Sequence, residues 1–399
     1  MNVLYFHHAG FFGGSGKSLL ELLLSLKKGS ITPYVVCQRG RMADEFRSAF
    51  GKVIRVKGLS QFDNTLYSFY RGRRWFVLLR ELFLLPFTFG AVLQAKLKFK
   101  NIDLVAINEY TLLPVALIVR LFFRCGIIVH CRSVQRLPMN SSRAALIAFL
   151  YNAIDATIVA IDQKVASTLP NALACRVVHN IFSYKCSDEV TRQPPVFNAA
   201  RPLVLGFVGG IGEMKGIFDL LEAVSICKEN NLNVLLIITG KFEREKTSGL
   251  LGYAIKFIKG SSDVENDVNR VIDSFNIRNY IQFTGFKFNL ADVYSNMDVL
   301  CFVSHFNATG RPVFEAGFFK KPSIVAIDRS WEDTIVNYKT GIIVQPKDAY
   351  SIYSAIEYYY SHPNTVCTMG ENAFELANKN FTPEVNAKEM LSIYNELIK

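Results

Sequence analysis

The sequence predicts an α/β protein made of two domains in tandem, each with a parallel β-sheet and crossover helices. Short apolar runs typical of buried strands alternate with segments long enough for helices. This alternation pauses at residues 183–202, a polar stretch that contains Pro194, Pro195 and Pro202, and then restarts. A chain of 399 residues is long enough for two cores. We therefore expect domains at 1–182 and 203–380, joined by a linker at 183–202.

The strands are predicted where apolar residues cluster between turn signals. In the first domain they are Val3–Phe6, Tyr34–Cys37, Val53–Val56, Leu104–Ile107, Ile127–Cys131, Ala156–Ala160 and Arg176–His179. In the second they are Leu203–Val208, Val234–Thr239, Tyr280–Thr284, Val299–Val303, Ser323–Ile327 and Gly341–Val344. The last segment, 381–399, begins with the helix-start signal Thr382-Pro383 and is expected to be a helix that packs back on the first domain.

Composition excludes several protein classes. With 50% hydrophobic, 13% aromatic and 20% charged residues, the chain is not disordered. Its eight cysteines form no CxxC pair, which favours reduced, buried thiols in a cytosolic protein over a zinc site or a disulfide framework. The N-terminus lacks the pattern of a signal peptide. The most apolar run, Leu82–Leu93, is too short for a transmembrane helix and contains Pro86 and Gly90.

The formal charge of +11 is concentrated in the first half of the chain. Residues 1–180 hold 23 Lys and Arg against 9 Asp and Glu, a net +14, whereas residues 181–399 hold 22 against 25, a net −3. A basic half of this kind favours a polyanionic partner, either a membrane surface or nucleic acid.

A glycine-rich turn follows the first predicted strand. It reads Ala9-Gly10-Phe11-Phe12-Gly13-Gly14-Ser15-Gly16-Lys17-Ser18. A nucleotide-triphosphate P-loop needs glycine where Phe11 stands, so that interpretation is disfavoured. The turn and the helix that begins near Ser15 can accept an anion or substrate, or can be a tight turn alone.

A second glycine loop, Gly209 to Gly216, follows the first strand of the second domain. Gly209, Gly210 and Gly212 permit close backbone approach, and Lys215 can place an ammonium beside a diphosphate. The alternative is a loop that serves helix–strand packing, with Lys215 in solvent.

The most informative stretch is residues 303–325. It predicts a strand, a polar loop with Asn307 and Gly310, and a short helix that contains Glu315. Near a helix N-terminus, N–H groups meet phosphate and a carboxylate accepts hydrogen bonds from sugar or ribose hydroxyls. Favourable interaction of Glu315 with the helix dipole is the alternative explanation.

These motifs together resemble the retaining GT-B nucleotide-sugar glycosyltransferases of family four, or group 1. The resemblance covers nearly the whole chain and is strongest from Val204 to Tyr358. Its motifs are Gly13-Gly14, Val178-His179-Asn180, Val208-Gly209 with Lys215-Gly216, Ile281–Phe286, Asp298–Ser304, Gly310-Arg311 with Glu315-Ala316, Lys321-Pro322 and Thr340-Gly341. The resemblance implies two Rossmann-like domains that face a cleft, with a C-terminal crossover helix.

The resemblance also implies roles for single residues. Lys215 would neutralise the donor diphosphate, a role that the family shares with an arginine at the position of Gly210. Glu315 would bind the nucleotide ribose. Asn307 stands where the family has the glutamate that addresses the donor sugar, which Gly310 also approaches.

Further donor contacts follow from the same motifs. Because Pro312 has no N–H, the backbones of Val313 and Phe314 are the expected phosphate donors, and Arg311 is the cation expected to replace the one missing at Gly210. Gly13, Gly14 and Gly209 would also line the diphosphate. Phe286 and Lys287 match the segment that holds the nucleotide base, although these aromatics are equally compatible with a core.

Two residues of the first domain complete the expected site. His130 matches a histidine that approaches the sugar, and we expect it to act with Lys215 in catalysis; a buried structural histidine is the alternative. Arg132 would lie close to phosphate or acceptor.

A basic and aromatic segment, 67–76, precedes the apolar run. Its Arg71, Arg73, Arg74 and Trp75 suit an acceptor or the headgroup region of an anionic membrane. A solvated helix with a core-facing apolar side and a single-stranded nucleic-acid surface are the alternatives, and no nucleic-acid module accompanies the segment.

The sequence thus predicts a cytoplasmic retaining glycosyltransferase on the inner face of the cell membrane. It would transfer sugar from a UDP- or GDP-linked donor to a glycan or lipid-linked acceptor in bacterial surface polysaccharide assembly. Front-face transfer without a protein nucleophile, metal or cofactor is implied. A catalytically silent GT-B protein that binds a nucleotide sugar or a partner enzyme is the alternative, based on Asn307 and Gly210.

Overall fold

The structure is a computed structural model that describes residues 1–27, 31–67, 70, 72–136, 138–139, 141–183, 200–242, 263–287 and 289–398. It divides into two compact units. The first comprises Met1–Ser183 and Asn380–Lys399, and the second comprises Tyr184–Lys379.

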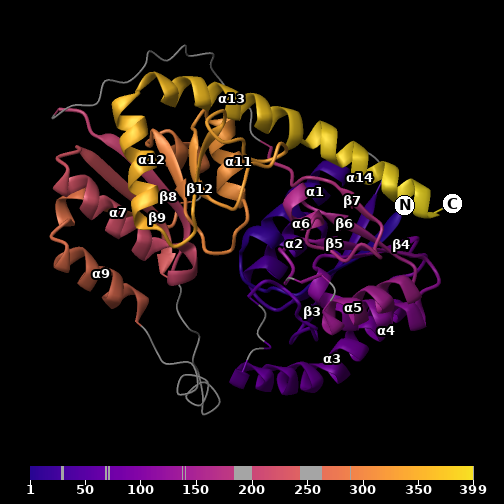
Figure 1. The fold of residues 1–399 in the computed structure, drawn as a ribbon. Coiled ribbons are helices and arrows are strands. Elements are labelled where there is room, and N and C mark those ends of the chain that lie inside the picture. The colour runs from indigo at the N-terminus through magenta and orange to yellow at the C-terminus, as the bar shows by residue number, and fades with distance from the viewer. Residues whose placement is uncertain are drawn as a thin grey trace. The chain divides into compact units, whose positions relative to one another are not determined.

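The first unit is built on a parallel seven-stranded sheet in the order β3-β2-β1-β4-β5-β6-β7 (Figure 1). The strands are β1 Asn2–His7, β2 Thr32–Gln38, β3 Val53–Val56, β4 Leu104–Ile107, β5 Gly126–Cys131, β6 Ala156–Ala160 and β7 Cys175–Val177. The helices are α1 Gly14–Lys27, α2 Arg41–Phe50, η1 Gly72–Phe76, α3 Val77–Lys98, η2 Tyr110–Leu112, α4 Leu113–Phe122, α5 Ser142–Ala153, α6 Gln163–Ala166 and α14 Pro383–Ile398.

Helices cover both faces of this sheet, which explains why its strands are nearly continuous apolar runs. Val3 and Tyr5 of β1 pack against α1, α2 and α14 in one buried cluster. Figure 1 shows α3, α4 and α5 on the opposite side of the sheet from α1 and α14. The Tyr5 hydroxyl donates to the Tyr394 hydroxyl at 3.1 Å, so α14 is tied to the centre of this sheet.

The second unit has a parallel six-stranded sheet in the order β10-β9-β8-β11-β12-β13. Its strands are β8 Leu203–Ile211, β9 Val234–Phe242, β10 Ile281–Gly285, β11 Val299–Phe302, β12 Ser323–Ala326 and β13 Gly341–Val344. The helices are η3 Glu213–Lys215, α7 Ile217–Glu229, α9 Val264–Ser274, η4 Arg278–Tyr280, α10 Leu290–Tyr294, α11 Arg311–Phe318, α12 Ala349–Ser361 and α13 Asn364–Asn380.

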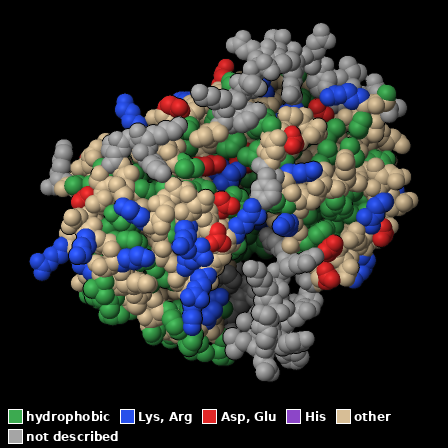
Figure 2. Space-filling model, turned by 180° about the vertical axis from the view of Figure 1, so that it is seen from behind, with side chains coloured by type: hydrophobic (Ala, Val, Ile, Leu, Met, Phe, Trp, Pro, Cys, Tyr) green, Lys and Arg blue, Asp and Glu red, His purple; other side chains and the backbone are tan. Residues whose placement is uncertain are grey.

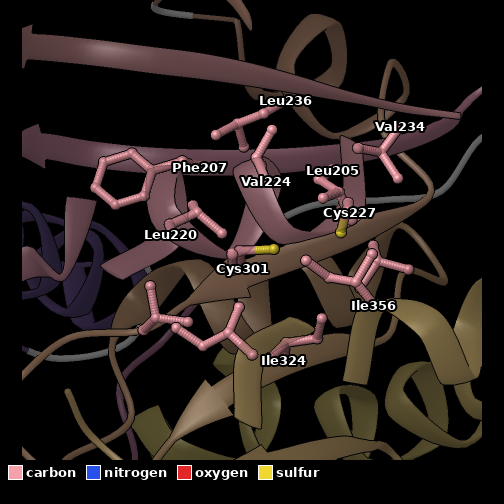
Figure 3. Packing of buried hydrophobic residues seen from close by; sticks show 14 of the residues in the cluster. Leu205, Phe207, Leu220, Val224, Cys227, Val234, Leu236, Cys301, Ile324 and Ile356 are labelled. Carbon is pink, nitrogen blue, oxygen red and sulfur yellow. The ribbon is translucent and has the colours of Figure 1, made fainter. Parts of the chain in front are cut away.

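One core cluster fills the space between this sheet and α7, α9 and α12. Figure 3 shows its side chains pointing toward one another, among them Phe207 of β8, Val224 of α7 and Ile356 of α12. Cys227 and Cys301 lie inside this cluster, and burial raises the pKa of the Cys227 thiol to about 12. Both cysteines therefore serve as small apolar residues.

The predicted α/β class and strand positions are confirmed, with ends that differ by a few residues. β8 and β9 are longer than predicted, because they continue through glycine to Ile211 and Phe242. Residues 184–199 of the predicted linker lie outside the described residues.

Helix α3 is longer than the apolar run Leu82–Leu93, so the expectation that this segment is too short to cross a membrane is wrong for its length. It spans 22 residues and contains Pro86, and by length and composition alone it could cross a membrane, with a mean hydropathy of 1.5. Only 22% of its apolar window is buried, unlike a core helix. Its buried face carries Glu81, Thr88 and Val92.

Candidate functional site

In parallel α/β sheets, ligands bind beyond the carboxyl ends of the strands. In the second unit, this edge is formed by the segments after β8, β9, β10 and β11. Gly216, between η3 and α7, has φ of 75°, and a Cβ there would lie 2.0 Å from the Val303 carbonyl oxygen. His305 N–H donates to the Met214 carbonyl at 3.1 Å. The loops after β8 and β11 are thus in close contact, and this contact requires glycine at position 216.

This contact places Lys215 beside the loop after β11. The Lys215 Nζ lies 4.7 Å from the centre of the Phe306 ring. The structure therefore brings Lys215 close to the polar stretch that the sequence singled out, at the strand edge where a diphosphate would bind. Gly209, near the end of β8, has φ of 141°, and nothing lies within 4 Å of a Cβ added there.

The short helix α11 begins where predicted. Gly310 is its N-cap, and a Cβ there would lie 2.4 Å from the tip of the Phe302 ring, which would have to shift to accept a larger residue. The Val313 N–H donates to the Gly310 carbonyl at 3.0 Å. The Val313 N–H could donate to a phosphate only if its bond to the Gly310 carbonyl were broken. The sequence analysis did not predict this bond.

Arg311 and Glu315 form an ion pair. The Arg311 Nε and Nη2 lie 3.0 and 2.9 Å from Glu315 Oε1, and their side chains are only 9% and 6% exposed. The Tyr294 hydroxyl donates to Glu315 Oε2 at 2.8 Å. Burial, with the Glu315 charge, holds the Tyr294 pKa well above its usual value. Both carboxylate oxygens are thus held by protein donors, and the Arg311 guanidinium is directed to Glu315.

Asn307 ties the loop after β11 to the loop after β12. Its φ is 49°, a left-handed conformation that asparagine tolerates. Its Oδ1 accepts the Asp328 N–H at 2.8 Å, a contact that does not use its Nδ2 group.

The predicted base-binding segment follows β10 at a bulge. The register with β9 shifts between Phe283 and Gly285, and Gly285 has φ of 67°. Phe286 is 40% exposed, and the Lys241 Nζ lies 5.2 Å from its ring centre. Lys287 is exposed. Sequence reasoning missed Lys241, because its place beside β8 and Phe286 depends on strand register.

In the first unit, His130 lies near the carboxyl end of β5. It is 3% exposed and its Nε2 has no partner among the described residues. Burial, with the nearby Arg132 charge, lowers its pKa to about 3. His130 is therefore neutral at physiological pH and offers hydrogen bonding rather than charge.

Arg132 joins the ends of three strands. Its Nε donates to Asn108 Oδ1 at 2.8 Å, after β4, and its Nη1 donates to Asn180 Oδ1 at 2.7 Å, after β7. The Asn108 amide in turn lies 2.9 Å from His7 Nδ1, at the end of β1. Arg132 is thus held in a network at the strand edge where an acceptor would bind.

Glu109 belongs to this edge and was missed from the sequence. Its Oε1 accepts the Tyr110 N–H at 2.9 Å, and its Oε2 accepts the Ser133 hydroxyl at 3.3 Å. Burial raises its pKa to about 7, although the Tyr110 N–H and the Arg132 charge oppose the shift. No local motif marks a carboxylate that becomes buried only when β4 and β5 pair.

Gly13 and Gly14 lie at the start of α1. A Cβ on Gly13 would lie 2.6 Å from the Phe11 ring, which is 65% exposed. The Lys17 Nζ lies 4.0 Å from Glu21 Oε1 and 5.7 Å from the centre of the Phe182 ring. The P-loop interpretation gains no support from this arrangement.

Of the predicted acceptor or membrane residues, Arg71 and the side chains of Arg73 and Arg74 lie outside what the structure describes. Trp75, in η1, stacks on Tyr70 at 5.4 Å and lies under Arg143, yet remains 48% exposed.

Comparison with known proteins agrees with this architecture. The family model described as Glycosyl transferases group 1 matches residues 189–376. The capsular polysaccharide biosynthesis glycosyltransferase CapM of Staphylococcus aureus is 27% identical over 196 residues, which cover 49% of this chain and 47% of CapM. The chain thus matches about half the length of this curated relative.

Solved structures share the fold over the whole chain. Anabaena HepE, solved in complex with UDP, superposes with a TM-score of 0.74 at 17% identity, and 100% of both chains is covered. Sucrose-phosphate synthase of Thermosynechococcus elongatus gives 0.71 at 17% identity, with 99% of this chain and 98% of that chain covered. Residues 189–376 therefore form a region similar to the group 1 glycosyltransferases, and the chain has the GT-B fold of these solved structures.

Proposed function

We propose that this protein is a retaining glycosyltransferase that moves a sugar from a UDP- or GDP-linked donor to an acceptor hydroxyl. The observation that carries the proposal is the convergence of the Gly209 loop, Lys215 and the start of α11 at the strand edge of the second unit. Anabaena HepE has been solved with UDP and with UDP-glucose, which supports a nucleotide-sugar donor.

Lys215 has the central role in this proposal. When the sugar leaves, negative charge develops on the diphosphate, and a fixed cation near that charge lowers the barrier. Glu315 supplies carboxylate lone pairs to the ribose, and the Asn307 amide addresses the sugar. His130, as a neutral imidazole, donates or accepts one hydrogen bond. The resemblance implies front-face transfer, in which no protein nucleophile, metal or cofactor takes part.

The test is turnover of a panel of UDP- and GDP-sugars by wild type, Lys215→Ala and Glu315→Ala. We expect donor hydrolysis and transfer in wild type and their loss in both variants. Full turnover in both variants would overturn the site assignment. Binding of a nucleotide with no turnover of any donor would instead favour the silent binding protein.

For the acceptor, we propose a lipid-linked glycan in bacterial surface polysaccharide assembly, reached by docking the first unit on the cytoplasmic face of the membrane. CapM, a capsular polysaccharide glycosyltransferase, supports the pathway. The docking surface, here called the α3–α5 surface, consists of exposed apolar residues on η1, α3, α4 and α5. They are Trp75, Phe76, Leu79, Leu82, Phe83, Phe87, Phe89, Leu93, Leu97, Leu121, Leu146 and Phe149.

Two observations support a lipid surface as the partner. The exposed apolar side chains are large and lie on helices that contact one another, and the rings of Phe89 and Phe122 join α3 to α4 at 5.2 Å. Cations flank them: Figure 2 shows Lys and Arg side chains beside the hydrophobic ones at the lower left, where α3 lies. Anionic headgroups attract such cations while aromatic and apolar side chains enter the interface.

Vesicle flotation tests this docking. We expect wild type to float with anionic vesicles more than with neutral ones, and the double variant Phe83→Ser, Leu97→Gln to float less. The control is Leu24→Gln, Val385→Ser, which changes two exposed apolar residues on α1 and α14, outside the α3–α5 surface. Equal flotation of wild type with both vesicle types would contradict the proposal.

A further inference from the structure

The inference concerns Lys241, at the carboxyl end of β9. We propose that Lys241 supplies the second cation of the donor diphosphate site, together with Lys215, and so compensates for the missing side chain at Gly210. The inference rests on the proposed nucleotide-sugar donor and deepens it.

Strand register places Lys241 at the site. β8 and β9 are parallel, and their register pairs Gly209 with Gly240 and Gly210 with Lys241. Paired residues of neighbouring parallel strands point to the same face of the sheet. The Lys241 side chain therefore lies on the same sheet face as Gly210, on the neighbouring strand, and Gly210 itself has no side chain.

The alternation of buried residues shows which face this is. The core cluster takes Leu205, Phe207 and Ile211 from β8, and Leu236 and Ile238 from β9. Gly210 and Lys241 lie at the other alternation and face away from this core. Lys241 is exposed. Its ammonium thus extends beyond the strand edge, where a ligand binds, and not into the apolar interior.

Two glycines beside Lys241, Gly240 and Gly209, leave the backbone without side chains at this edge of the sheet. A Cβ on Gly240 would lie 1.8 Å from the Gly209 carbonyl oxygen, so the two strand ends approach as closely as backbone allows. Nothing lies within 4 Å of a Cβ added at Gly209. A ligand phosphate can therefore approach the backbone closely, with charge supplied from the side.

The charges of the other residues at this edge favour Lys241 as the second cation. Arg311, the cation that the sequence suggested, directs Nε and Nη2 to Glu315 and is only 9% exposed in its side chain. Lys215 in η3 and Lys241 in β9 instead carry compact ammonium groups on flexible stems, and two such groups suit the two phosphates of a nucleoside diphosphate.

Phe286 fixes where the Lys241 ammonium lies without a ligand. The 5.2 Å separation of Nζ and ring centre is a cation–π contact, which is weak at an exposed site. Because that contact is weak, a phosphate oxygen can draw the ammonium away. The same neighbourhood allows a different role, in which Lys241 and Phe286 bind the base.

Titration calorimetry with UDP and uridine, and with GDP and guanosine, separates the two roles. The variants are Lys241→Met, Lys241→Arg and the control Lys339→Met, an exposed lysine at the opposite strand edge. We expect Lys241→Met to weaken UDP or GDP binding about ten- to a hundredfold, the range for a hydrogen bond to a charged group. Nucleoside binding should stay unchanged, and Lys241→Arg should restore most of the loss.

Salt provides a second measurement on the same variants. Dissolved salt screens a charge–charge contact. The difference in UDP or GDP affinity between wild type and Lys241→Met should therefore become smaller as the salt concentration rises. Two results would overturn the inference: unchanged UDP and GDP affinity in Lys241→Met, or equal weakening of nucleotide and nucleoside binding. The proposed donor site would still stand in either case if a further variant, Lys215→Met, abolished UDP or GDP binding. Failure of wild type to bind either nucleoside diphosphate would overturn the proposed donor as well.

Discussion

At the scale of single residues, the buried Arg311–Glu315 ion pair gives a prediction about stability. Both side chains are nearly buried, and removing one partner of such a pair leaves an uncompensated charge. We predict that Arg311→Met lowers the free energy of unfolding by about 3 kcal/mol, measured by urea denaturation. Unchanged stability, combined with lost nucleotide binding, would show instead that Arg311 serves mainly as the phosphate cation.

Glu109 gives a pH-dependent prediction. Its pKa is about 7 in the fold and about 4.5 in an unfolded chain. Between these values the folded carboxyl keeps its proton while the unfolded one loses it, so the free energy of unfolding falls as pH rises through this window. The total loss of unfolding free energy from Glu109 is about 3 kcal/mol, and this loss is complete above pH 7.

The variant Glu109→Gln should lack this decline. Urea unfolding of wild type and variant at pH 5 and pH 8 measures the difference, because contributions from the buried histidines are common to both and cancel. Glu81→Gln is the matched control, since Glu81 is also buried in the first unit. Parallel pH profiles of wild type and Glu109→Gln would contradict the assignment.

At the scale of elements, the joint between η3 and α7 depends on Gly216. Alanine there would adopt a φ of 75° and place its Cβ 2.0 Å from the Val303 oxygen. Gly51 is a matched control, because its φ is 73° but nothing lies within 4 Å of an added Cβ. We predict a loss of about 1 kcal/mol for Gly51→Ala and at least about 3 kcal/mol for Gly216→Ala in urea unfolding. Equal losses would show that the contact with Val303 is unimportant.

The sequence predicted the strands well and the side-chain contacts poorly, for a physical reason. Strands such as Leu104–Ile107 are buried on both faces, so their apolar runs identify them without reference to neighbours. The Lys241–Gly210 pairing and the contacts of Glu109 arise between strands that are separated along the chain by a helix, so no local pattern reveals them. Helix α3 was underestimated because Pro86 and Gly90 interrupt its apolar run, although both are exposed within an unbroken helix.

At the scale of the whole molecule, the uneven charge of the sequence follows the division of the chain into two units. The unit rich in Lys and Arg carries the α3–α5 surface and the network around Arg132. The second unit, whose net charge is close to zero, carries Lys215 and Lys241 at the carboxyl-end edge of its sheet. We propose that acceptor and membrane belong to the first unit and the nucleotide sugar to the second.

The central claim is retaining transfer from a nucleoside diphosphate sugar. Proton NMR of a UDP- and GDP-sugar panel with the full chain tests it most directly, because it reports both donor cleavage and the anomeric configuration of the released or transferred sugar. We predict release of the nucleoside diphosphate from at least one donor, with the sugar first appearing in the anomeric configuration of that donor. A product of inverted configuration, or no cleavage of any donor, would contradict the account.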